Sequence, residues 1–348
     1  MCIVKCDLCH AMRYFIFATI LFLGGMVILP FPAHALTISP VKMEISGDPG
    51  QTLQDKLVLF NEEKDTKTLY SSVENFESRG ESGAPFFLPE RIGLATWIKT
   101  QEQVTLKPKE EKTIPFSVII PKNAEPGGHF AAILWGMTPP DATKGGQVAI
   151  GGRLGVLILL RVSGEVKEGG GLLDFGGKDK QKFFSSLPIT LAYRFNNTGG
   201  NRVVPQGEIK IKNLFGFTSA NIPANKNEGS VLPGSARKFE VVWAPLEIPS
   251  GGTATQGDLS LSGQGEAGFW PAVKTQWREF HFGWYTANLN LTWGAANQTA
   301  NATYSFFVIP WQLLLIIFVI LAIVGFLGIW VIKKYNRWII SKHETRIT

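Results

Sequence analysis

The chain has 348 residues, of which 45% are hydrophobic and 18% are charged, and its formal net charge is +6. At about 100–200 residues per domain, this length suffices for two domains with their own cores. The high hydrophobic and low charged content excludes a disordered chain. The cysteines are limited to Cys2, Cys6 and Cys9, which excludes a disulfide-stapled scaffold, and the 37 Gly and 20 Pro fit turn-rich β structure.

The first 35 residues have the features of a secretory signal. Basic residues precede an apolar run at residues 14–29, and Ala33-His34-Ala35 supplies a small-x-small cleavage pattern. An uncleaved membrane anchor is the alternative. Pro30 ends the apolar run and favours cleavage, so we assign residues 1–35 to a signal peptide.

Residues 36–307 predict an all-β class, because strands separated by turn residues recur along them. Residues 154–162 (LGVLILLRV) are nearly all apolar and too short to cross a membrane, so we expect a strand buried on both faces. Polar and apolar residues alternate, as in half-buried antiparallel strands, at residues 189–195, 209–211, 239–243 and 285–293. No long segment of residues 36–307 has helical periodicity.

An internal repeat indicates two domains of one type. Residues 106–118 can be laid over residues 231–243, since each has a turn with proline, a basic residue and an alternating strand. Upstream of each lies an apolar strand that ends in Phe-Asn, at Phe60-Asn61 and Phe195-Asn196. In an immunoglobulin-like sandwich these would be the end of strand B and strand E. Coincidental similarity between strands is the alternative.

The sequence therefore predicts two tandem immunoglobulin-like β-sandwiches, at residues 36–165 and 166–307. The glycine-rich residues 164–177 are expected to form a flexible joint between them.

Residues 308–332 predict one transmembrane helix. Residues 313–332 contain no charged or strongly polar side chain, and at about 1.5 Å per residue they span about 30 Å, the hydrocarbon thickness of a bilayer. The basic tail at residues 333–348 is expected in the cytoplasm, which gives a single-pass type I topology with an extracellular ectodomain. The residues that we assign to the anchor are Trp311, Trp330, Lys333, Lys334 and Arg337.

Motifs for catalysis or cofactor binding give no candidate site. Cys6-Asp7-Leu8-Cys9-His10 matches a haem-attachment pattern but precedes the apolar run of the signal. Residues 263–268 match Gly-x-Gly-x-x-Gly, but Phe269-Trp270-Pro271 follows and predicts a glycine-rich turn without the helix that a dinucleotide site needs. No zinc-ligand spacing and no nucleophile motif occurs. We expect no enzymatic activity, no catalytic residue, no metal and no cofactor.

Aromatic side chains in loops and turns are the remaining candidates for binding. They suit sugar rings and protein partners because they bury much area at little cost in rotamer entropy. Packing in a core is the alternative for each of them. The candidate ligand contacts are Phe86, Phe87, Trp97, His129, Phe130 and Trp270.

Short motifs also carry a family resemblance. They are Leu36-Thr-Ile-Ser-Pro40, Asp48-Pro49-Gly50-Gln51, Phe60-Asn61-Glu62, Ala95-Thr-Trp97-Ile98 and Glu125-Pro126-Gly127-Gly128-His129-Phe130. They look like the N-terminal immunoglobulin-like domain of bacterial WxL-interacting surface proteins and their membrane-anchored relatives. The resemblance implies peptidoglycan binding by the first domain and contacts with other surface components by the second. The chain departs from that family by an insertion at residues 76–89 and by Gly-Gly-His-Phe where the family has a more glycine-rich strand.

We therefore expect a non-enzymatic, membrane-anchored envelope protein whose extracellular domains bind a cell-wall polymer (peptidoglycan) or another surface protein. The lack of cysteine after residue 35 favours a bacterial envelope. The net positive charge comes largely from the basic tail, so it does not imply a nucleic-acid partner. One alternative is a membrane-tethered assembly chaperone that acts by β-strand addition and would need an open strand edge. A second is a wall hydrolase, which would need polar side chains clustered in a cleft.

Overall fold

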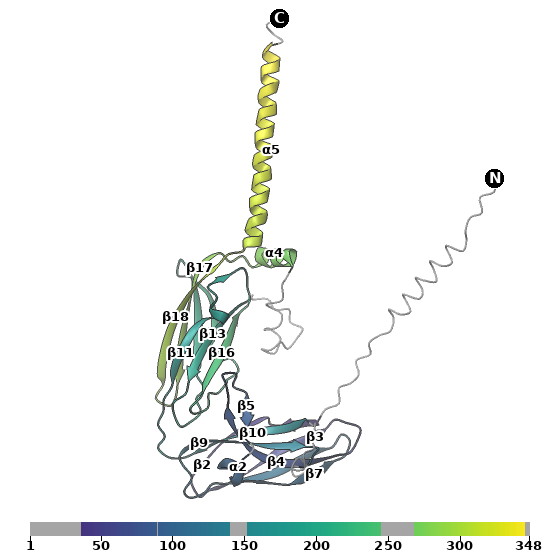
Figure 1. Cartoon of the computed structure of the whole chain (residues 1–348), viewed down its shortest axis with the longest axis vertical. Helices are drawn as coiled ribbons and strands as arrows, with labels where there is room; N and C mark the ends of the chain where they lie inside the picture. The colour runs from purple at the N-terminus through teal and green to yellow at the C-terminus, as the bar shows by residue number, and fades with distance from the viewer. Residues whose placement is uncertain (1–35, 89, 140–151, 245–267, 345–348) are drawn as a thin grey trace, which may run out of the picture.

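The structure of the chain is a computed structural model that describes residues 36–88, 90–139, 152–244 and 268–344. Two β-sandwiches meet at an angle, and a long helix leaves the second sandwich at the end away from the first (Figure 1). The predicted signal peptide at residues 1–35 and the haem-attachment pattern within it lie outside the described residues.

The first sandwich is built from a four-stranded and a six-stranded sheet. The order in the first sheet is β1-β3-β8-β6, and in the second it is β2-β10-β9-β4, with β5 and β7 both paired to β4. Its strands are β1 (Leu36–Ser39), β2 (Lys42–Gly47), β3 (Thr52–Asn61), β4 (Lys67–Ser78), β5 (Pro85–Phe87), β6 (Ile98–Thr100), β7 (Gln103–Leu106), β8 (Glu111–Ile119), β9 (Gly127–Gly136) and β10 (Arg153–Val162), with the short helix α2 (Leu94–Trp97) before β6.

The second sandwich is built from a three-stranded sheet, β11-β13-β16, and a five-stranded sheet, β12-β18-β17-β14-β15. Its strands are β11 (Gly171–Gly177), β12 (Phe183–Phe184), β13 (Ile189–Asn196), β14 (Gln206–Asn213), β15 (Thr218–Pro223), β16 (Ala236–Trp243), β17 (Gly283–Trp293) and β18 (Gln298–Val308), with a 3₁₀ turn η2 (Lys178–Lys180) after β11. Helix α4 (Phe269–Arg278) lies between β16 and β17 in the chain, and helix α5 (Trp311–Glu344) follows β18.

Both sandwiches have the strand order of an immunoglobulin-like fold, with A, B and E in one sheet and C, F and G in the other. In each, the first strand divides between the sheets. β1 pairs antiparallel with β3 before β2 pairs parallel with β10, and β11 pairs antiparallel with β13 before β12 pairs parallel with β18. The predicted all-β class with two immunoglobulin-like sandwiches is confirmed. The predicted boundary between residues 165 and 166 lies between β10 and β11 and stays a prediction.

Hydrophobic patterning explains where the strands lie in each core. The apolar run at residues 154–162 forms the inner strand β10, whose Val156, Ile158 and Leu160 face the first core with at most 1% of their surface exposed. Leu159 faces the opposite side of the sheet and is 6% exposed. The prediction of a strand buried on both faces is confirmed. The alternating segments form β13, β14, β16 and β17, as expected from their period of two.

A fully buried asparagine, Asn61, is the last residue of β3, which is strand B of the first sandwich. Asn61 donates its side-chain amide to the carbonyls of Asp65 and Lys107, at 2.8 and 3.0 Å, and accepts a bond of 3.0 Å from the Glu63 backbone N–H. It therefore ties the turn after β3 to the turn before β8, where backbone groups would otherwise be buried without partners.

Asn197 makes the same connection in the second sandwich. Its amide donates to the carbonyls of Asn201 and Val231, at 2.7 and 2.9 Å, and its oxygen accepts a bond of 2.9 Å from the Gly199 N–H. The repeat therefore has a structural cause, since both copies use one buried side chain to join two turns.

The structural equivalence corrects the alignment of the repeat by one position. Asn61 donates its backbone N–H to Glu110, and Asn197 donates its backbone N–H to Ser235, at the same point before the E strand. The counterpart of Asn61 is thus Asn197 and not Asn196, which lies in β13 with its side chain only half-buried.

Two other local expectations were wrong. Residues 171–177 of the expected flexible joint form strand β11, because their pairing with β13 satisfies the backbone despite three glycines. Helix α4 begins at Phe269, where a glycine-rich turn without a following helix was expected, and its ten residues are too few to show a period in the sequence. His281 precedes β17 and is half-buried against Trp243, with ring centroids 5.1 Å apart.

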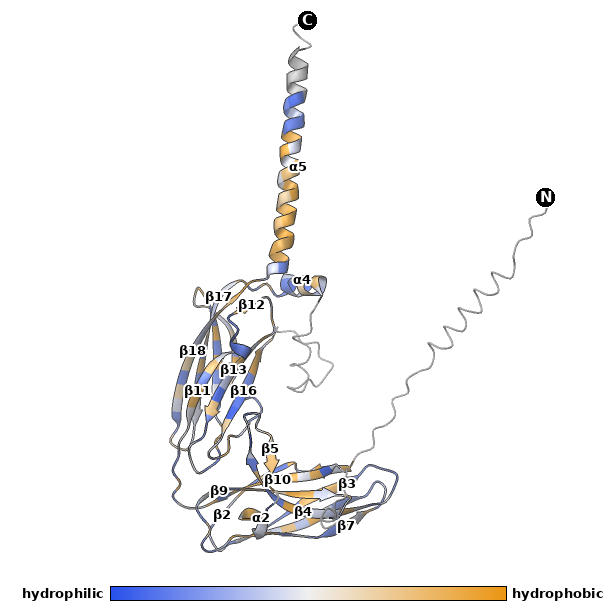
Figure 2. Ribbon diagram, in the orientation of Figure 1, coloured by the Kyte–Doolittle hydropathy of each residue, from blue (hydrophilic) through white to orange (hydrophobic). Residues whose placement is uncertain are grey.

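Helix α5 leaves the second sandwich directly after β18. Its segment Trp311–Arg337 is long and apolar enough to cross a membrane, and none of its most apolar window is buried inside the protein. The apolar part is followed by the charged residues Lys333, Lys334 and Arg337, seen as a blue band in Figure 2. The Lys334 ammonium lies 5.1 Å from the ring centroid of Trp330. A helix of this kind can serve as a membrane anchor.

We expect the substitution Asn61→Ala or Asn197→Ala to lower the free energy of unfolding by about 2–4 kcal/mol, because each leaves several buried backbone groups without partners. Hydrogen–deuterium exchange of the detergent-solubilised protein measures the effect in each sandwich separately. Asn61→Ala should speed exchange in β3 and β8, and Asn197→Ala in β13 and β16. Asn123→Ala, at an exposed turn position, serves as the control. Equal exchange in Asn61→Ala and in this control would contradict the assigned role.

Candidate functional site

The two sandwiches meet through a small apolar cluster. It lies on the outer face of the sheet that contains β9 and β10, and Leu232 of the second sandwich packs against it. Phe76 and Phe130 are in contact there, with ring centroids 6.0 Å apart. The members of the cluster are Phe76, Phe87, Phe130, Ala132, Leu134, Leu157, Leu159 and Leu232. Burial of these side chains favours the docking of the sandwiches, because apolar surface is removed from water.

The turn between β4 and β5, at residues 79–84, crosses to the second sandwich, and we call it the arm (Figure 1). Glu81 accepts a bidentate ion pair from the guanidinium of Arg194 in β13, in which the Nε–Oε2 distance is 2.9 Å. The carbonyl of Glu81 accepts a bond of 2.8 Å from the Lys238 N–H on the edge of β16. The arm therefore joins the two sandwiches through both a side-chain pair and a backbone bond.

A direct backbone contact reinforces the junction. The Gly128 N–H donates to the carbonyl of Gly200 at 2.9 Å. A Cβ atom on the neighbouring Gly127, whose φ is +122°, would lie 2.8 Å from that same carbonyl oxygen. Only glycine permits this approach without a shift of the backbone. Gly127 and Gly128, the first residues of β9, therefore fix how closely the two sandwiches approach.

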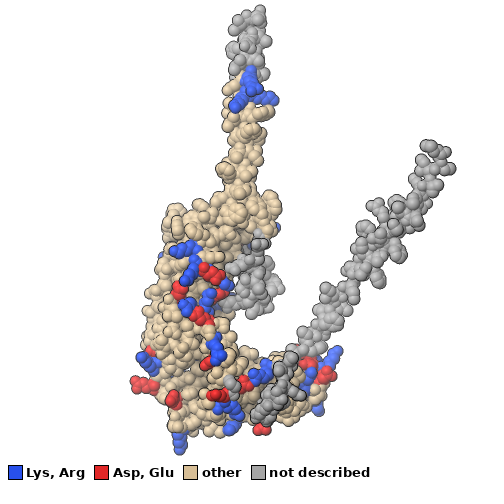
Figure 3. Space-filling model, viewed as in Figure 1, with Lys and Arg blue, Asp and Glu red and all other residues tan. Residues whose placement is uncertain are grey.

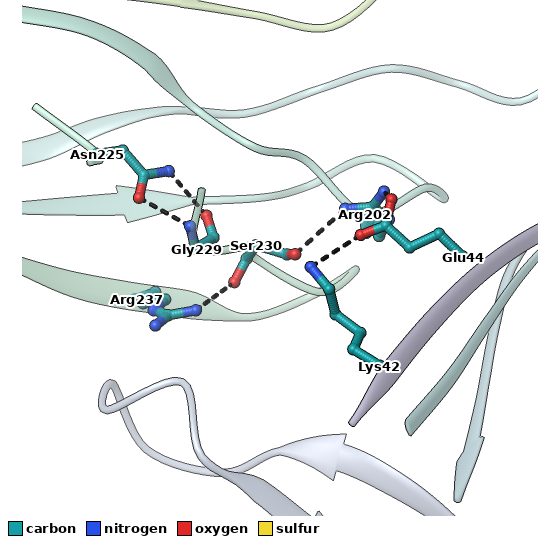
Figure 4. A network of polar contacts seen from close by, with 7 residues as sticks. All are labelled: Lys42, Glu44, Arg202, Asn225, Gly229, Ser230 and Arg237. Carbon is teal, nitrogen blue, oxygen red and sulfur yellow. Dashed lines mark hydrogen bonds and ion pairs between the residues drawn. The ribbon is translucent and has the colours of Figure 1, made fainter. Parts of the chain in front are cut away.

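Charged side chains line the junction on the side of β2 (Figure 4). Glu44 of β2 pairs with Lys42 at 2.9 Å and with Arg202 of the second sandwich. Arg202 also donates to the Ser230 hydroxyl at 3.2 Å, and Arg237 donates to the Ser230 carbonyl at 2.9 Å. This chain of contacts holds Arg202 beside β2.

Strand β2 has one open edge. In the described part of the chain it pairs with β10 alone. Val41 and Gly47 accept bonds from Leu157 and Ser163 of the β10 side, each at 3.0 Å. In a parallel pair, the N–H and C=O of one residue point to the same side and successive residues alternate. The backbone groups of Lys42, Glu44 and Ser46 therefore point to the open edge.

The open edge of β2 borders a pocket of about 540 Å³ between the sandwiches. Phe130 and Leu159 give it an apolar wall, and Arg161, Glu168 and Arg202 give it charges. Its lining also includes Asn201, whose side-chain oxygen is buried and has no hydrogen-bond partner among the described residues. The pocket thus brings together outward backbone groups of β2, apolar surface and charges of both signs.

The predicted ligand contacts do not form one site. Phe87 and Phe130 meet in the interdomain apolar cluster, and of the six residues only Phe130 also lines the pocket. Phe86 is 39% exposed and lies under the Arg79 guanidinium at 3.3 Å. Sugar or protein binding by these residues stays a prediction.

The other three candidates lie elsewhere. Trp97 contacts His129, with ring centroids 4.8 Å apart and ring planes tilted by 50°, and it packs partly against the first core. The His129 Nε2 lies 2.8 Å from the Glu125 carbonyl. Trp270 is on α4, beside α5. Sequence reasoning missed Glu44, Asn201 and Arg202, because their proximity depends on how the two sandwiches dock and leaves no local pattern.

The arrangement of the pocket suits the binding of an extended chain. Among the described residues there is no group of three or more His, Cys, Asp or Glu side chains that could hold a metal ion. The distinctive feature is a row of backbone donors and acceptors beside apolar and charged side chains, which is the surface that an extended peptide requires.

No family model and no curated protein matches the chain. Among solved structures, the class 5 fimbriae chaperone CfaA is similar over 78% of this chain and 99% of its own, at 11% identity and a TM-score of 0.35. The CsuC–CsuE chaperone–tip adhesion subunit complex of Acinetobacter baumannii is similar over 60% of this chain and 90% of the matched chain, at 11% identity and a TM-score of 0.33. A protein of unknown function from Porphyromonas gingivalis is similar over 78% of this chain and 99% of its own, at 11% identity and a TM-score of 0.25. Scores at this level carry no conclusion about function.

The ion pair of the arm predicts a pH-dependent junction. The hydrogen bond from Arg194 holds the pKa of Glu81 below its ordinary value of 4.5. A carboxyl group with a lowered pKa in the folded state stabilises that state above its ordinary pKa, and the contribution is lost as the pH falls through the lowered value. We expect Glu81→Gln to speed hydrogen exchange of the Lys238 amide at pH 7, with a difference from the parent that shrinks at acid pH.

The matched control for this measurement is Glu77→Gln. Glu77 lies at the base of the arm and pairs with Arg79 at 3.0 Å. Parent and variant are compared at each pH, so that the intrinsic pH dependence of exchange cancels. The same acceleration in both variants would contradict a specific role for the pair between Glu81 and Arg194.

Proposed function

We propose that this chain is a membrane-anchored binding protein that holds an extended segment of a partner protein against the open edge of β2. The observation that carries the proposal is the position of that edge. The outward backbone groups of Glu44 and Ser46 border a pocket that Phe130, Arg161 and Arg202 also line. An added strand would satisfy these groups by main-chain hydrogen bonds.

The pocket supports selection among partner segments. At about 3.3 Å per residue, the six residues of β2 offer an edge of about 20 Å. Alternate side chains of an added strand would face Phe130 and Leu159, or the charges of Arg161, Glu168 and Arg202. The charged side chains of Lys42 and Glu44 on the edge itself disfavour unselective pairing with other strands.

Strand addition is the mode of the assembly chaperone that the sequence analysis gave as its alternative. A protein that temporarily covers a partner's unpaired strand prevents that strand from aggregating. We infer such an assembly role here, in which the long apolar helix α5 keeps the site close to a membrane. The basic residues after the apolar part of α5 favour a cytoplasmic C-terminus and hence an external site.

A peptide-binding experiment tests the proposal on the full chain in lipid nanodiscs. Peptides selected from a displayed library for binding to the parent protein are titrated against Glu44→Pro and Glu44→Ala. Both variants lose the ion pair with Arg202, and both keep the bonds between β2 and β10. Only proline removes the N–H of residue 44 that points to the open edge. We expect Glu44→Pro to weaken binding about tenfold or more, which corresponds to the loss of one or two main-chain bonds. Glu44→Ala should retain most of the affinity.

Hydrogen exchange gives a second measurement on the same complex. A bound strand should slow exchange of the Glu44 and Ser46 amides, which face the open edge. Peptides that bind Glu44→Pro as tightly as the parent would overturn strand addition at β2. Co-sedimentation of the protein with insoluble peptidoglycan, without selection of any peptide, would favour the wall-polymer function that the resemblance to WxL-interacting proteins implies.

A further inference from the structure

The end of the second sandwich from which α5 leaves carries many exposed apolar side chains. Strand register brings several segments to this end, since Gly283 pairs with Val308, Val308 pairs with Phe184, and Asn213 pairs with Tyr285. The start of β17, the ends of β14 and β18, and β12 therefore share one rim. Helix α5 begins three residues after β18, so this rim lies beside the entry of α5 into the bilayer.

An aromatic cluster covers the outer face of the five-stranded sheet at this rim. Phe282, Trp284 and Phe183 surround Phe307, with ring centroids 5.8, 5.0 and 6.5 Å from it. The exposed fractions are 53% for Phe282, 49% for Trp284 and 67% for Phe183. The core of the sandwich lies on the other side of the sheet, where Tyr285 and Phe306 are buried, so these rings do not serve that core.

The turn between β14 and β15 adds a second apolar element. Leu214, Phe215 and Phe217 are 69%, 80% and 70% exposed. The turn is held by Asn213, whose side-chain oxygen accepts bonds from the Phe215 and Phe217 N–H groups at 3.1 and 3.0 Å. These three large side chains are therefore presented to the outside by an ordered turn.

Helix α4 is the third element, and it lies across the base of α5 (Figure 1). Its Gln276 is buried, accepts a bond of 3.0 Å from the Leu313 N–H of α5 and also bonds Gln312. Trp270 and Trp277 are 72% and 73% exposed. They are seven residues apart, so they lie on the same face of the helix. The buried glutamine thus fixes two exposed indoles beside the start of α5.

The surroundings of this end indicate what covers it. In Figure 3 the shoulder of the second sandwich around the base of α5 shows almost no Lys, Arg, Asp or Glu on the face in view, whereas charges are spread over the remainder of both sandwiches. Indole and phenyl rings are favoured at the headgroup level of a bilayer. A short amphipathic helix with tryptophans on one face is typical of segments that lie in that layer.

We propose that this surface binds the lipid headgroup layer of the leaflet that α5 enters. It consists of the turn at residues 214–217, the rings of Phe183, Phe282 and Trp284, and the exposed face of α4. The proposal rests on the membrane anchoring proposed above for α5. A bilayer is favoured over a protein partner because α5 places the surface against the membrane without any further binding event.

Site-directed spin labelling of the full chain in nanodiscs tests the proposal. The nanodiscs contain phosphatidylcholine and phosphatidylglycerol in a ratio of about three to one. Cys2, Cys6 and Cys9 are replaced by serine, and single labels are placed by Phe215→Cys and by Trp277→Cys. Collision rates with oxygen, which partitions into lipid, and with a nickel complex, which stays in water, report the depth of each label.

Two further labels serve as references. Phe318→Cys, in the apolar part of α5, reports the bilayer interior. Thr292→Cys is exposed on the outer face of the same strand as Trp284, but nine residues along β17 from Gly283, or about 30 Å from the rim. We expect the ratio of oxygen to nickel collisions at Phe215→Cys and Trp277→Cys to exceed that at Thr292→Cys several-fold and to stay below that at Phe318→Cys.

The possible results separate the two proposals. If Phe318→Cys reports lipid while Phe215→Cys and Trp277→Cys match Thr292→Cys, the headgroup contact is wrong and the anchor stands. If Phe318→Cys is itself in water, the anchor is wrong and the headgroup contact fails with it. If the labels at 215 and 277 are shielded from both oxygen and nickel, a protein covers the surface, which also overturns the proposal. Trp270→Cys repeats the measurement if Trp277→Cys does not fold.

Discussion

The docking of the two sandwiches is the constraint on which the candidate site depends. The apolar cluster supplies non-directional attraction, and the arm and the close backbone approach at Gly128 and Gly200 set the relative position. The bidentate pair between Glu81 and Arg194 adds directional contacts between strands of different sandwiches. Without this docking β2 would be an ordinary exposed edge, and Asn201 and Arg202 would not stand beside it. An isolated first sandwich therefore would not contain the site.

Several parts of the fold could be predicted from the sequence because their signals are local. Alternation of polar and apolar residues predicts β13, β14, β16 and β17, and a nearly continuous apolar run predicts β10. The repeat between the sandwiches was visible because turn residues and the strand after them recur together. Its alignment was one residue wrong at Asn196, since only the structure shows that Asn197 makes the buried contacts.

The site could not be predicted in the same way, since it depends on contacts between residues far apart in the chain. Glu44 and Arg202 are 158 residues apart, and no spacing in one sequence identifies such a pair. Glu81 and Arg194 are 113 residues apart, so the role of the arm could not be predicted either. Helix α4 was missed for a different reason, because its buried residue is the polar Gln276, which is paired with α5.

The attachment of α5 to the last strand has a mechanical consequence. A load between α5 and the first sandwich enters the second sandwich through β18 and leaves it through β11, which follows β10 in the chain. β18 is paired with β17 along eleven residues and parallel to β12 at Phe183 and Phe184. Tension along these strands shears their hydrogen bonds simultaneously instead of opening them one after another. The geometry thus gives the second sandwich resistance to stretching between α5 and the first sandwich.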